Sequence, residues 1–436
     1  MAHSGTVRRS DSAQADGARP RIRFETLDSW RGICALLVAM MHFPASGFLA
    51  ESPVVRGGYL FVDYFFVLSG AVIMHGYGHR IADGASYLRF MLLRFGRVYP
   101  LHVAVLLLFV AFEGLRLAVP ALRGDGAAPF TDGNSLSGLV SSLLLLNGVG
   151  LEDQLVWNGP SWSISSEFWT YLLFGAVVLL LRERLWLALV AAVAVAPVVL
   201  LATATPEYMD TTYAMGFVRC IYGFSLGALI YRLFRREAMP ASGDAAPSRL
   251  LWTALEVGAM LMVAAFVSLA ARNVWSFAAP FVFGAALFVF MHERGLVSQL
   301  LRMRLFLWLG TLSYGIYMVH IFVQSRIINA GTLAGKVLGQ DFVGPFDMAG
   351  ESFYGFGVNG ALFGTLMMLV MVVTVVIAAW IGNLLVEKPF QALTRRLVDG
   401  RDGETGESQR RYAEVAFRPA REAMSAAAPV ADMPGR

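Results

Sequence analysis

The stretch Gly360-Ala-Leu-Phe-Gly-Thr-Leu-Met-Met-Leu-Val-Met-Val-Val-Thr-Val-Val-Ile-Ala-Ala-Trp-Ile-Gly-Asn-Leu-Leu-Val386 contains no charged residue. It is longer than the about 20 apolar residues that an α-helix needs to cross the hydrocarbon core of a bilayer. Similar runs recur along the chain, near residues 32–50, 58–78, 99–119, 165–181, 185–203, 213–231, 250–271, 275–292 and 305–326. The sequence therefore predicts a protein that crosses a membrane many times.

The composition supports the same fold class. Hydrophobic residues make up 57% of the 436 residues, charged residues make up 15%, and the mean hydropathy is +0.59. A soluble protein carries about 25% charged residues. We therefore predict an all-α, polytopic helical bundle of about ten transmembrane helices embedded in the lipid bilayer.

Charge and cysteine usage exclude several other classes. The net charge of +4 is modest, and no nucleic-acid partner is expected. Cys34 and Cys220 lie in apolar runs and have no metal-ligand spacing. They are expected to be small core residues, and no metal site is expected.

The positions of the arginines predict the orientation of the helices. One apolar piece, residues 136–150, is too short for a crossing and suits a re-entrant or interfacial segment. Without it ten spans remain, and the arginine-rich segments all fall on one side of the membrane. The positive-inside rule then places both termini in the cytoplasm. We expect a multi-pass protein of the inner (plasma) membrane.

Composition also divides the chain into three parts. Residues 1–24 form a polar, arginine-rich arm, and residues 391–436 form a polar tail. Both are expected to be disordered and cytoplasmic. Residues 25–390 are expected to form the membrane domain.

Ionisable residues inside the spans are candidates for function because they are costly in a bilayer. Arg31 and His42 are eleven residues apart in the first span, which places both on one helix face about 16 Å apart. His42 suits proton transfer, and Asp63 in the second span is expected at a similar depth, where its carboxylate could orient the imidazole. The alternatives are a hydrogen-bonded core histidine and a carboxylate that reaches interfacial water.

A pair of arginines precedes the third span. Arg94 and Arg97 are three residues apart and therefore share one helix face. Two guanidinium groups can hold phosphates through paired hydrogen bonds. The alternative is that they only anchor the cytoplasmic end of the helix.

The fourth span begins with a run of aromatic and polar residues. Trp faces stack on sugar rings, and hydroxyls and a carboxylate can bind sugar hydroxyls or pass protons. The alternative is an ordinary aromatic belt at the membrane interface. The candidate residues are Trp162, Ser163, Ser165, Glu167 and Trp169.

Taken in order, these motifs resemble the acyltransferase-3 family of bacterial membrane O-acyltransferases. The resemblance covers about residues 24–390. It rests on Leu27-Asp-Ser-Trp-Arg31-Gly with His42, Phe65-Phe-Val-Leu-Ser-Gly70, Arg94-Phe-Gly-Arg97-Val-Tyr-Pro100, Pro160-Ser-Trp-Ser-Ile-Ser-Ser-Glu167, Leu312-Ser-Tyr-Gly-Ile-Tyr-Met-Val-His320 and Glu387-Lys-Pro-Phe390. Ser166 departs from the family pattern, in which many members carry a bulkier apolar residue there, and this puts the fit of the acceptor in doubt.

The resemblance implies an enzyme that moves an acyl group, acetyl in the first instance, from acyl-CoA to a hydroxyl of a carbohydrate or lipid-linked glycan. Acyl-CoA would be a co-substrate, with no permanently bound cofactor. His42 and Arg31 match the essential histidine motif of the family, and Arg94 and Arg97 match its proposed donor-binding pair. His320 is expected to contact the substrate, and His42 is expected to act as general base or as a transient acyl carrier.

Two readings from other classes stay open on sequence grounds. One is a secondary transporter in which His42, Asp63 and Glu167 relay protons. The other is a membrane scaffold without chemistry. Replacement of His42 without loss of function would favour the scaffold.

Overall fold

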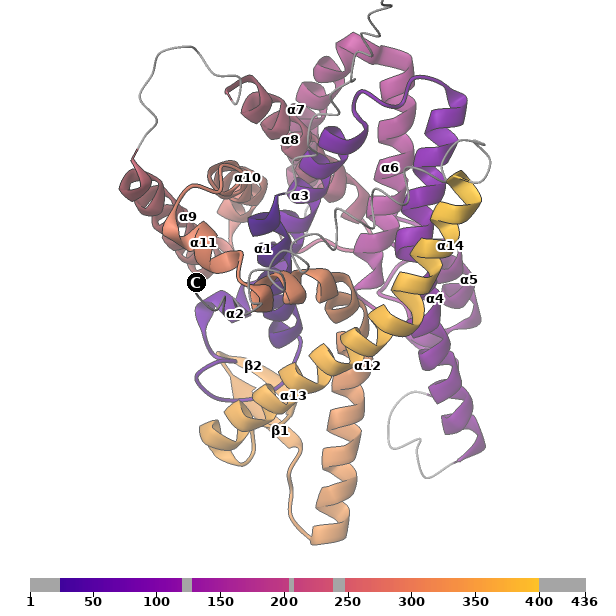
Figure 1. Cartoon of the computed structure of the whole chain (residues 1–436). Helices are drawn as coiled ribbons and strands as arrows, with labels where there is room; N and C mark the ends of the chain where they lie inside the picture. Colours follow the sequence, from indigo (N-terminus) through magenta and orange to yellow (C-terminus); the bar gives the residue numbers. More distant parts are fainter. Residues whose placement is uncertain (1–23, 120–127, 204–207, 238–247, 400–436) are drawn as a thin grey trace, which may run out of the picture.

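The part of the chain that the structure describes folds into a bundle of α-helices with one β-hairpin (Figure 1). The computed structural model describes residues 24–119, 128–203, 208–237 and 248–399. The first half holds α1 (Glu25–Met41), α2 (Pro53–Arg56), α3 (Phe61–Tyr77), α4 (Gly84–Ala118), α5 (Leu136–Leu143), α6 (Ser161–Leu181) and α7 (Leu185–Thr203). The second half holds α8 (Gly216–Glu237), α9 (Arg249–Ala270), α10 (Ala279–Phe290), α11 (Leu296–Leu301), α12 (Arg304–Leu338), β1 (Gly344–Met348), β2 (Glu351–Gly355), α13 (Gly360–Gly382) and α14 (Lys388–Asp399).

The helices account for the ten expected crossings. Seven helical stretches of the described chain are long and apolar enough to cross a membrane. One of them, Ser161–Thr203, is interrupted at Arg182, whose φ of 45° lies outside the helical region, so α6 and α7 are two crossings. The apolar helix Val274–Phe290 is shorter. Helix α1 completes the set, but its 17 residues begin at Glu25 and end at Met41, earlier than the expected span 32–50. The prediction of a polytopic helical membrane protein is confirmed.

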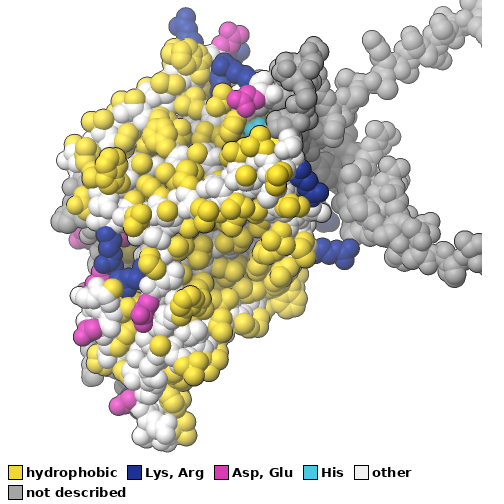
Figure 2. All heavy atoms as spheres, turned by 90° about the vertical axis from the view of Figure 1, so that its left-hand side faces the viewer, with side chains coloured by type: hydrophobic (Ala, Val, Ile, Leu, Met, Phe, Trp, Pro, Cys, Tyr) yellow, Lys and Arg dark blue, Asp and Glu magenta, His cyan; other side chains and the backbone are white. Residues whose placement is uncertain are grey.

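The outer surface matches this assignment. Figure 2 shows a broad apolar face, with charged side chains gathered toward its upper and lower ends. On α9, Leu261 and Leu269 are 65% and 77% exposed. Large apolar side chains exposed over such an area are stable only against lipid.

The charged residues separate between the two ends of the bundle. Arg182, Arg232 and Arg235 surround one opening. Arg56 and Arg272 lie at the opposite end, where both pair with Glu351 of the hairpin, at 3.6 Å and 2.9 Å. The fold therefore keeps the arginines of this opening apart from those that pair with the hairpin.

Residues 136–150 do not cross the bundle. Helix α5 has only 8 residues, and the chain after it turns back against its neighbours. Tyr99 of α4 donates a hydrogen bond to the carbonyl of Leu143 at 3.0 Å, and Ser165 of α6 donates to that of Leu145 at 2.6 Å. The expected re-entrant character of this piece agrees with that packing.

Two expectations about local structure need correction. Residues 391–399 are helical and belong to α14, whereas the sequence predicted a disordered tail from residue 391. The apolar residues Phe390, Leu393 and Leu397 recur at helical spacing, which makes α14 amphipathic. The arm (1–23) and the rest of the tail (400–436) lie outside the described residues.

The second correction is the antiparallel hairpin β1–β2, which was not expected in an all-α chain. It lies between α12 and α13 at the bottom of Figure 1. The carbonyl of Pro44 accepts a hydrogen bond from the Phe356 amide at 2.9 Å. The hairpin therefore secures the segment that follows α1.

Glycines allow the central helices to approach closely. A Cβ placed on Gly70 of α3 would lie 1.8 Å from the carbonyl oxygen of Phe224 in α8. A Cβ on Gly227 of α8 would lie 1.8 Å from the carbonyl oxygen of Val67 in α3. Small residues of this kind bring transmembrane backbones into contact. The α3–α8 pair is therefore intolerant of any larger residue at these two positions.

This packing predicts different outcomes for two substitutions in the same helix. Gly70→Ala must push α3 away from α8, and we expect it to lower stability by about 1–3 kcal/mol. Gly76→Ala adds a methyl group where no atom lies within 4 Å, so stability should be unchanged or slightly raised. Thermal unfolding of both purified variants in detergent tests this, and equal shifts in Tm would contradict it.

Candidate active site

His42 follows the last residue of α1 and presents one ring nitrogen for chemistry. Its Nδ1 lies 2.9 Å from the Val38 carbonyl oxygen. Because a carbonyl oxygen only accepts, Nδ1 must carry a proton, and in the neutral ring Nε2 then keeps its lone pair. The side chain is exposed, and no described residue hydrogen-bonds Nε2. A neutral imidazole in this tautomer can act as a general base.

A second histidine lies against it. The ring centroids of His42 and His320 are 5.0 Å apart. His320 is fully buried, and its Nδ1 lies 2.7 Å from the Tyr317 carbonyl oxygen. The same argument assigns the proton to Nδ1, and the buried Nε2 has no hydrogen-bond partner among the described residues. Two imidazoles with bare Nε2 atoms therefore share this site.

The contact between α1 and α12 sets the position of both rings. A Cβ on Gly32 would lie 2.6 Å from the backbone of Leu309, and one on Gly310 would lie 2.2 Å from the carbonyl oxygen of Asp28. Further along, Gln324 of α12 donates to the carbonyl of Ala39 at 2.6 Å. These contacts hold the two helices in register up to the histidines.

Three arginines gather nearer the start of α1. Arg94 donates to the Tyr77 hydroxyl at 3.3 Å, and its guanidinium carbon lies 5.2 Å from the centre of that ring. Arg97 lies within electrostatic range of both Arg94 and Arg31. Arg94 and Arg97 are half-buried, and neither forms an ion pair with a carboxylate of the described residues. Arg31 pairs only loosely with Asp28, at 3.6 Å. The cluster thus has positive charge available for an anion.

Glu387 lies near this cluster and was not selected from the sequence as a site residue. It is 5% exposed, and its Oε1 has no hydrogen-bond partner among the described residues. It ends a π-helical segment, Asn383–Glu387, between α13 and α14, and such segments are frequent at functional sites. The Glu-Lys-Pro motif was the only sequence feature that indicated it.

Glu167 belongs to a short chain of hydroxyl groups. Tyr171 donates to Glu167 Oε1 at 2.5 Å. Ser69 Oγ lies 2.8 Å from the Tyr171 hydroxyl, and because Tyr171 has already used its only proton, Ser69 is the donor. Glu167 is therefore hydrogen-bonded, and Tyr171 and Ser69 extend this chain from α6 to α3.

Asp63 does not face His42, which corrects the sequence expectation. Its two carboxylate oxygens accept hydrogen bonds from Arg219 Nε and Nη2 at 2.9 Å and 2.8 Å. Arg219 also donates to the carbonyls of Tyr59 and Thr211, and both members of the pair are fully buried. The carboxylate is used in holding α3 to α8. The Val38 carbonyl orients His42 in its place.

Arg219 was missed in the sequence analysis. An arginine within the apolar run 213–231 is itself a candidate for an intramembrane partner. Its guanidinium also lies 5.5 Å from the ring centres of Tyr59 and Trp162. Trp162 is thereby part of the wall around this ion pair.

The remaining candidates at the start of α6 are hydrogen-bonded to other groups of the protein. Ser163 donates to the Tyr317 hydroxyl at 2.8 Å, and Trp169 Nε1 donates to the Leu145 carbonyl at 2.7 Å, beside Ser165. Ser163 and Ser165 could donate a hydrogen bond to an acceptor substrate only if these contacts within the protein broke. Their observed contacts position α12 and the re-entrant segment.

The Asp63–Arg219 pair leads to a test of its structural role. Asp63→Ala leaves a buried guanidinium uncompensated, and we expect a loss of about 3–5 kcal/mol in stability. Adding Arg219→Ala should cost little more, because the uncompensated charge is then removed as well. Thermal unfolding of the single and double variants measures this, with Asp341→Ala on the exposed surface as control.

A catalytic carboxylate would behave differently. In that case Asp63→Asn would lower turnover while the protein stayed folded. The stability lost in Arg219→Ala would then be the same with and without the Asp63 substitution. That pattern would contradict the structural assignment.

Comparison with known proteins identifies a matching family and two relatives of this chain. The profile of a family described as "Acyltransferase domain" matches residues 24–387. "Protein 2 in picA locus" of Rhizobium radiobacter is 35% identical over 154 residues, which are 34% of this chain and 78% of that protein. "Acyltransferase MdmB" of Streptomyces mycarofaciens is 33% identical over 183 residues, which are 38% of this chain and 43% of that protein. No solved structure matches the chain significantly.

Proposed function

The chain belongs to the acyltransferase-3 family and is a membrane O-acyltransferase, and we propose that it moves an acyl group, acetyl in the first instance, from acyl-CoA to a hydroxyl of a carbohydrate. The observation that carries this proposal is the bare Nε2 of His42 next to His320. Acyl-CoA is a co-substrate in this scheme, and no cofactor is bound permanently.

The proposed chemistry centres on His42. Its Nε2 takes the proton of the acceptor hydroxyl while the hydroxyl oxygen attacks the thioester carbonyl carbon. The new C–O bond forms, the C–S bond breaks, and the imidazolium returns the proton to the leaving thiolate of coenzyme A. Transient acylation of Nε2 is the alternative route to the same products.

His320 is proposed to bind the acceptor. Its Nε2 is a buried acceptor without a partner among the described residues, which is costly unless a ligand supplies a donor. A second hydroxyl of a carbohydrate would satisfy it while the first is attacked. Trp162, Ser163, Ser165 and Trp169 are proposed to shape this acceptor side through the backbone that they hold, with Glu167 contributing a nearby negative charge.

Arg94, Arg97 and Arg31 are proposed to hold the phosphates of the donor. Like charges close together are unfavourable unless an anion joins them. The planar fork of guanidinium matches phosphate oxygens. With the arginines near one end of α1 and His42 at the other, the donor would extend along α1 toward the histidines.

We also propose the orientation and the location of the protein. The arginine-rich end would face the cytoplasm by the positive-inside rule, with both termini on that side, in the inner (plasma) membrane. Acyl-CoA would then reach Arg94 and Arg97 from the compartment where it is made. A transporter that relays protons through His42, Asp63 and Glu167 fits less well, because Asp63 is already neutralised by Arg219.

Donor binding and chemistry are expected to separate in two variants. Arg94→Ala should weaken acyl-CoA binding about 10- to 150-fold, because one charge-assisted hydrogen bond to a phosphate is lost. His42→Gln should bind acyl-CoA normally but lose about 100- to 10,000-fold in kcat, because a general base acts in the transition state. Acyl-CoA affinity and thiol release in the presence of a carbohydrate acceptor measure the two effects on purified protein.

Arg80→Ala is the matched control, since Arg80 is an exposed arginine outside the cluster. Unchanged affinity in Arg94→Ala would show that the pair only anchors the helix. Full thiol release and acceptor acylation in His42→Gln would exclude His42 as base or carrier.

A further inference from the structure

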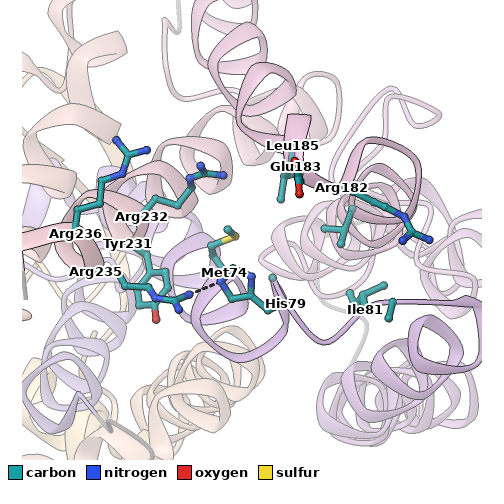
Figure 3. A pocket seen from close by; sticks show the side chains of 13 residues that line it. Met74, His79, Ile81, Arg182, Glu183, Leu185, Tyr231, Arg232, Arg235 and Arg236 are labelled. Carbon is teal, nitrogen blue, oxygen red and sulfur yellow. Dashed lines mark hydrogen bonds between the residues drawn. The ribbon is translucent and has the colours of Figure 1, made fainter. Parts of the chain in front are cut away.

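A second basic site lies at the arginine-rich end, apart from His42. It is a pocket of about 600 Å³ between the end of α3, the α6–α7 connection and the end of α8. Figure 3 shows Arg232 and Arg235 on one side of the opening and Arg182 on the other. No step of the proposed acyl transfer uses these residues.

The charge of this pocket is strongly one-sided. Four arginines line it, with Glu183 as the acidic residue among the lining side chains. Arg235 Nη1 donates to His79 Nε2, the contact drawn as a dashed line in Figure 3. Burial and the nearby charges of Arg235 and Arg232 lower the pKa of His79 below its usual value. The ring therefore stays neutral near pH 7 and adds no charge, but it holds Arg235 in place.

Below the arginines the pocket is apolar. Its wall includes Met74, Val178 and Leu185, which lie at the points where α3, α6 and α7 end or begin. The pocket therefore lies where the apolar helices give way to charged loops, which is the level of lipid head groups. A ligand that fills it needs an anionic part and an apolar part.

The pocket is separate from the donor cluster. Tyr77 of α3 contacts Arg94 through its hydroxyl and its ring. Met74 and Gly78 of the same stretch line the pocket. The last turn of α3 therefore stands between the two sets of arginines.

We propose that this pocket binds the phosphate head group of an anionic phospholipid of the surrounding leaflet, with Arg182, Arg232 and Arg235 around the phosphate and the acyl chains against Met74, Val178 and Leu185. Basic pockets between transmembrane helices suit such head groups. Coenzyme A offers the same phosphate chemistry, but it lacks an apolar part for this wall. The site does not depend on the proposed acyl transfer.

The experiment measures lipid retention by native mass spectrometry. The parent protein in neutral detergent is titrated with phosphatidylglycerol and, separately, with phosphatidylcholine. We expect preferential retention of phosphatidylglycerol, about 30-fold weaker in Arg232→Gln/Arg235→Gln. Arg302→Gln/Arg304→Gln removes the same charge from the same end outside the pocket, and it should behave like the parent.

A second variant keeps the charge and avoids any effect of the arginines on insertion. Ala82 is exposed and lines the pocket, so Ala82→Trp fills the space and should also weaken retention. Equal retention in the parent, the Arg232→Gln/Arg235→Gln variant and Ala82→Trp would overturn the site. Displacement of phosphatidylglycerol by coenzyme A would overturn the lipid assignment and give the pocket to a soluble phosphate ligand.

Discussion

The close approach of α1 and α12 at Gly32 and Gly310 is the constraint on which the candidate active site depends. Neither position has room for a Cβ, so the two backbones touch, and the register that they adopt there continues to His42 and His320. The rings meet because two helices more than 250 residues apart in sequence are held at this distance. A wider separation of the two backbones would move the rings apart, and no single site would then contain both histidines.

Two buried polar groups of the described chain are hydrogen-bonded within the protein. Asp63 is held by Arg219, and the Ser165 hydroxyl of α6 is held by the Leu145 carbonyl. His320 Nε2 and Glu387 Oε1 are instead buried without partners among the described residues. Because an unsatisfied buried polar atom is costly, such atoms are the best candidates for contact with a substrate.

The membrane class, the crossings and most helix bounds could be predicted from the sequence. The reason is that the thickness of the bilayer sets the length of each apolar run that crosses it. It could not show the partner of Asp63, since Arg219 lies 156 residues away and only the packing of α3 on α8 joins them. The hairpin was missed because its strands are only five residues each and lie in the connection between two spans. Helix α14 was missed because a charged amphipathic helix has the composition of a disordered tail. The pairing of His42 with His320 likewise needed three-dimensional coordinates.

The protonation of His42 is the most direct test of the account, because a general base needs a bare Nε2. Solid-state NMR of ¹⁵N-histidine-labelled protein in bilayers reports the tautomer of each ring, and comparison with His42→Gln identifies the signal of His42. The account predicts a neutral ring with the proton on Nδ1, at the pH where acyl transfer proceeds. A proton on Nε2, or a cationic ring at that pH, would contradict it.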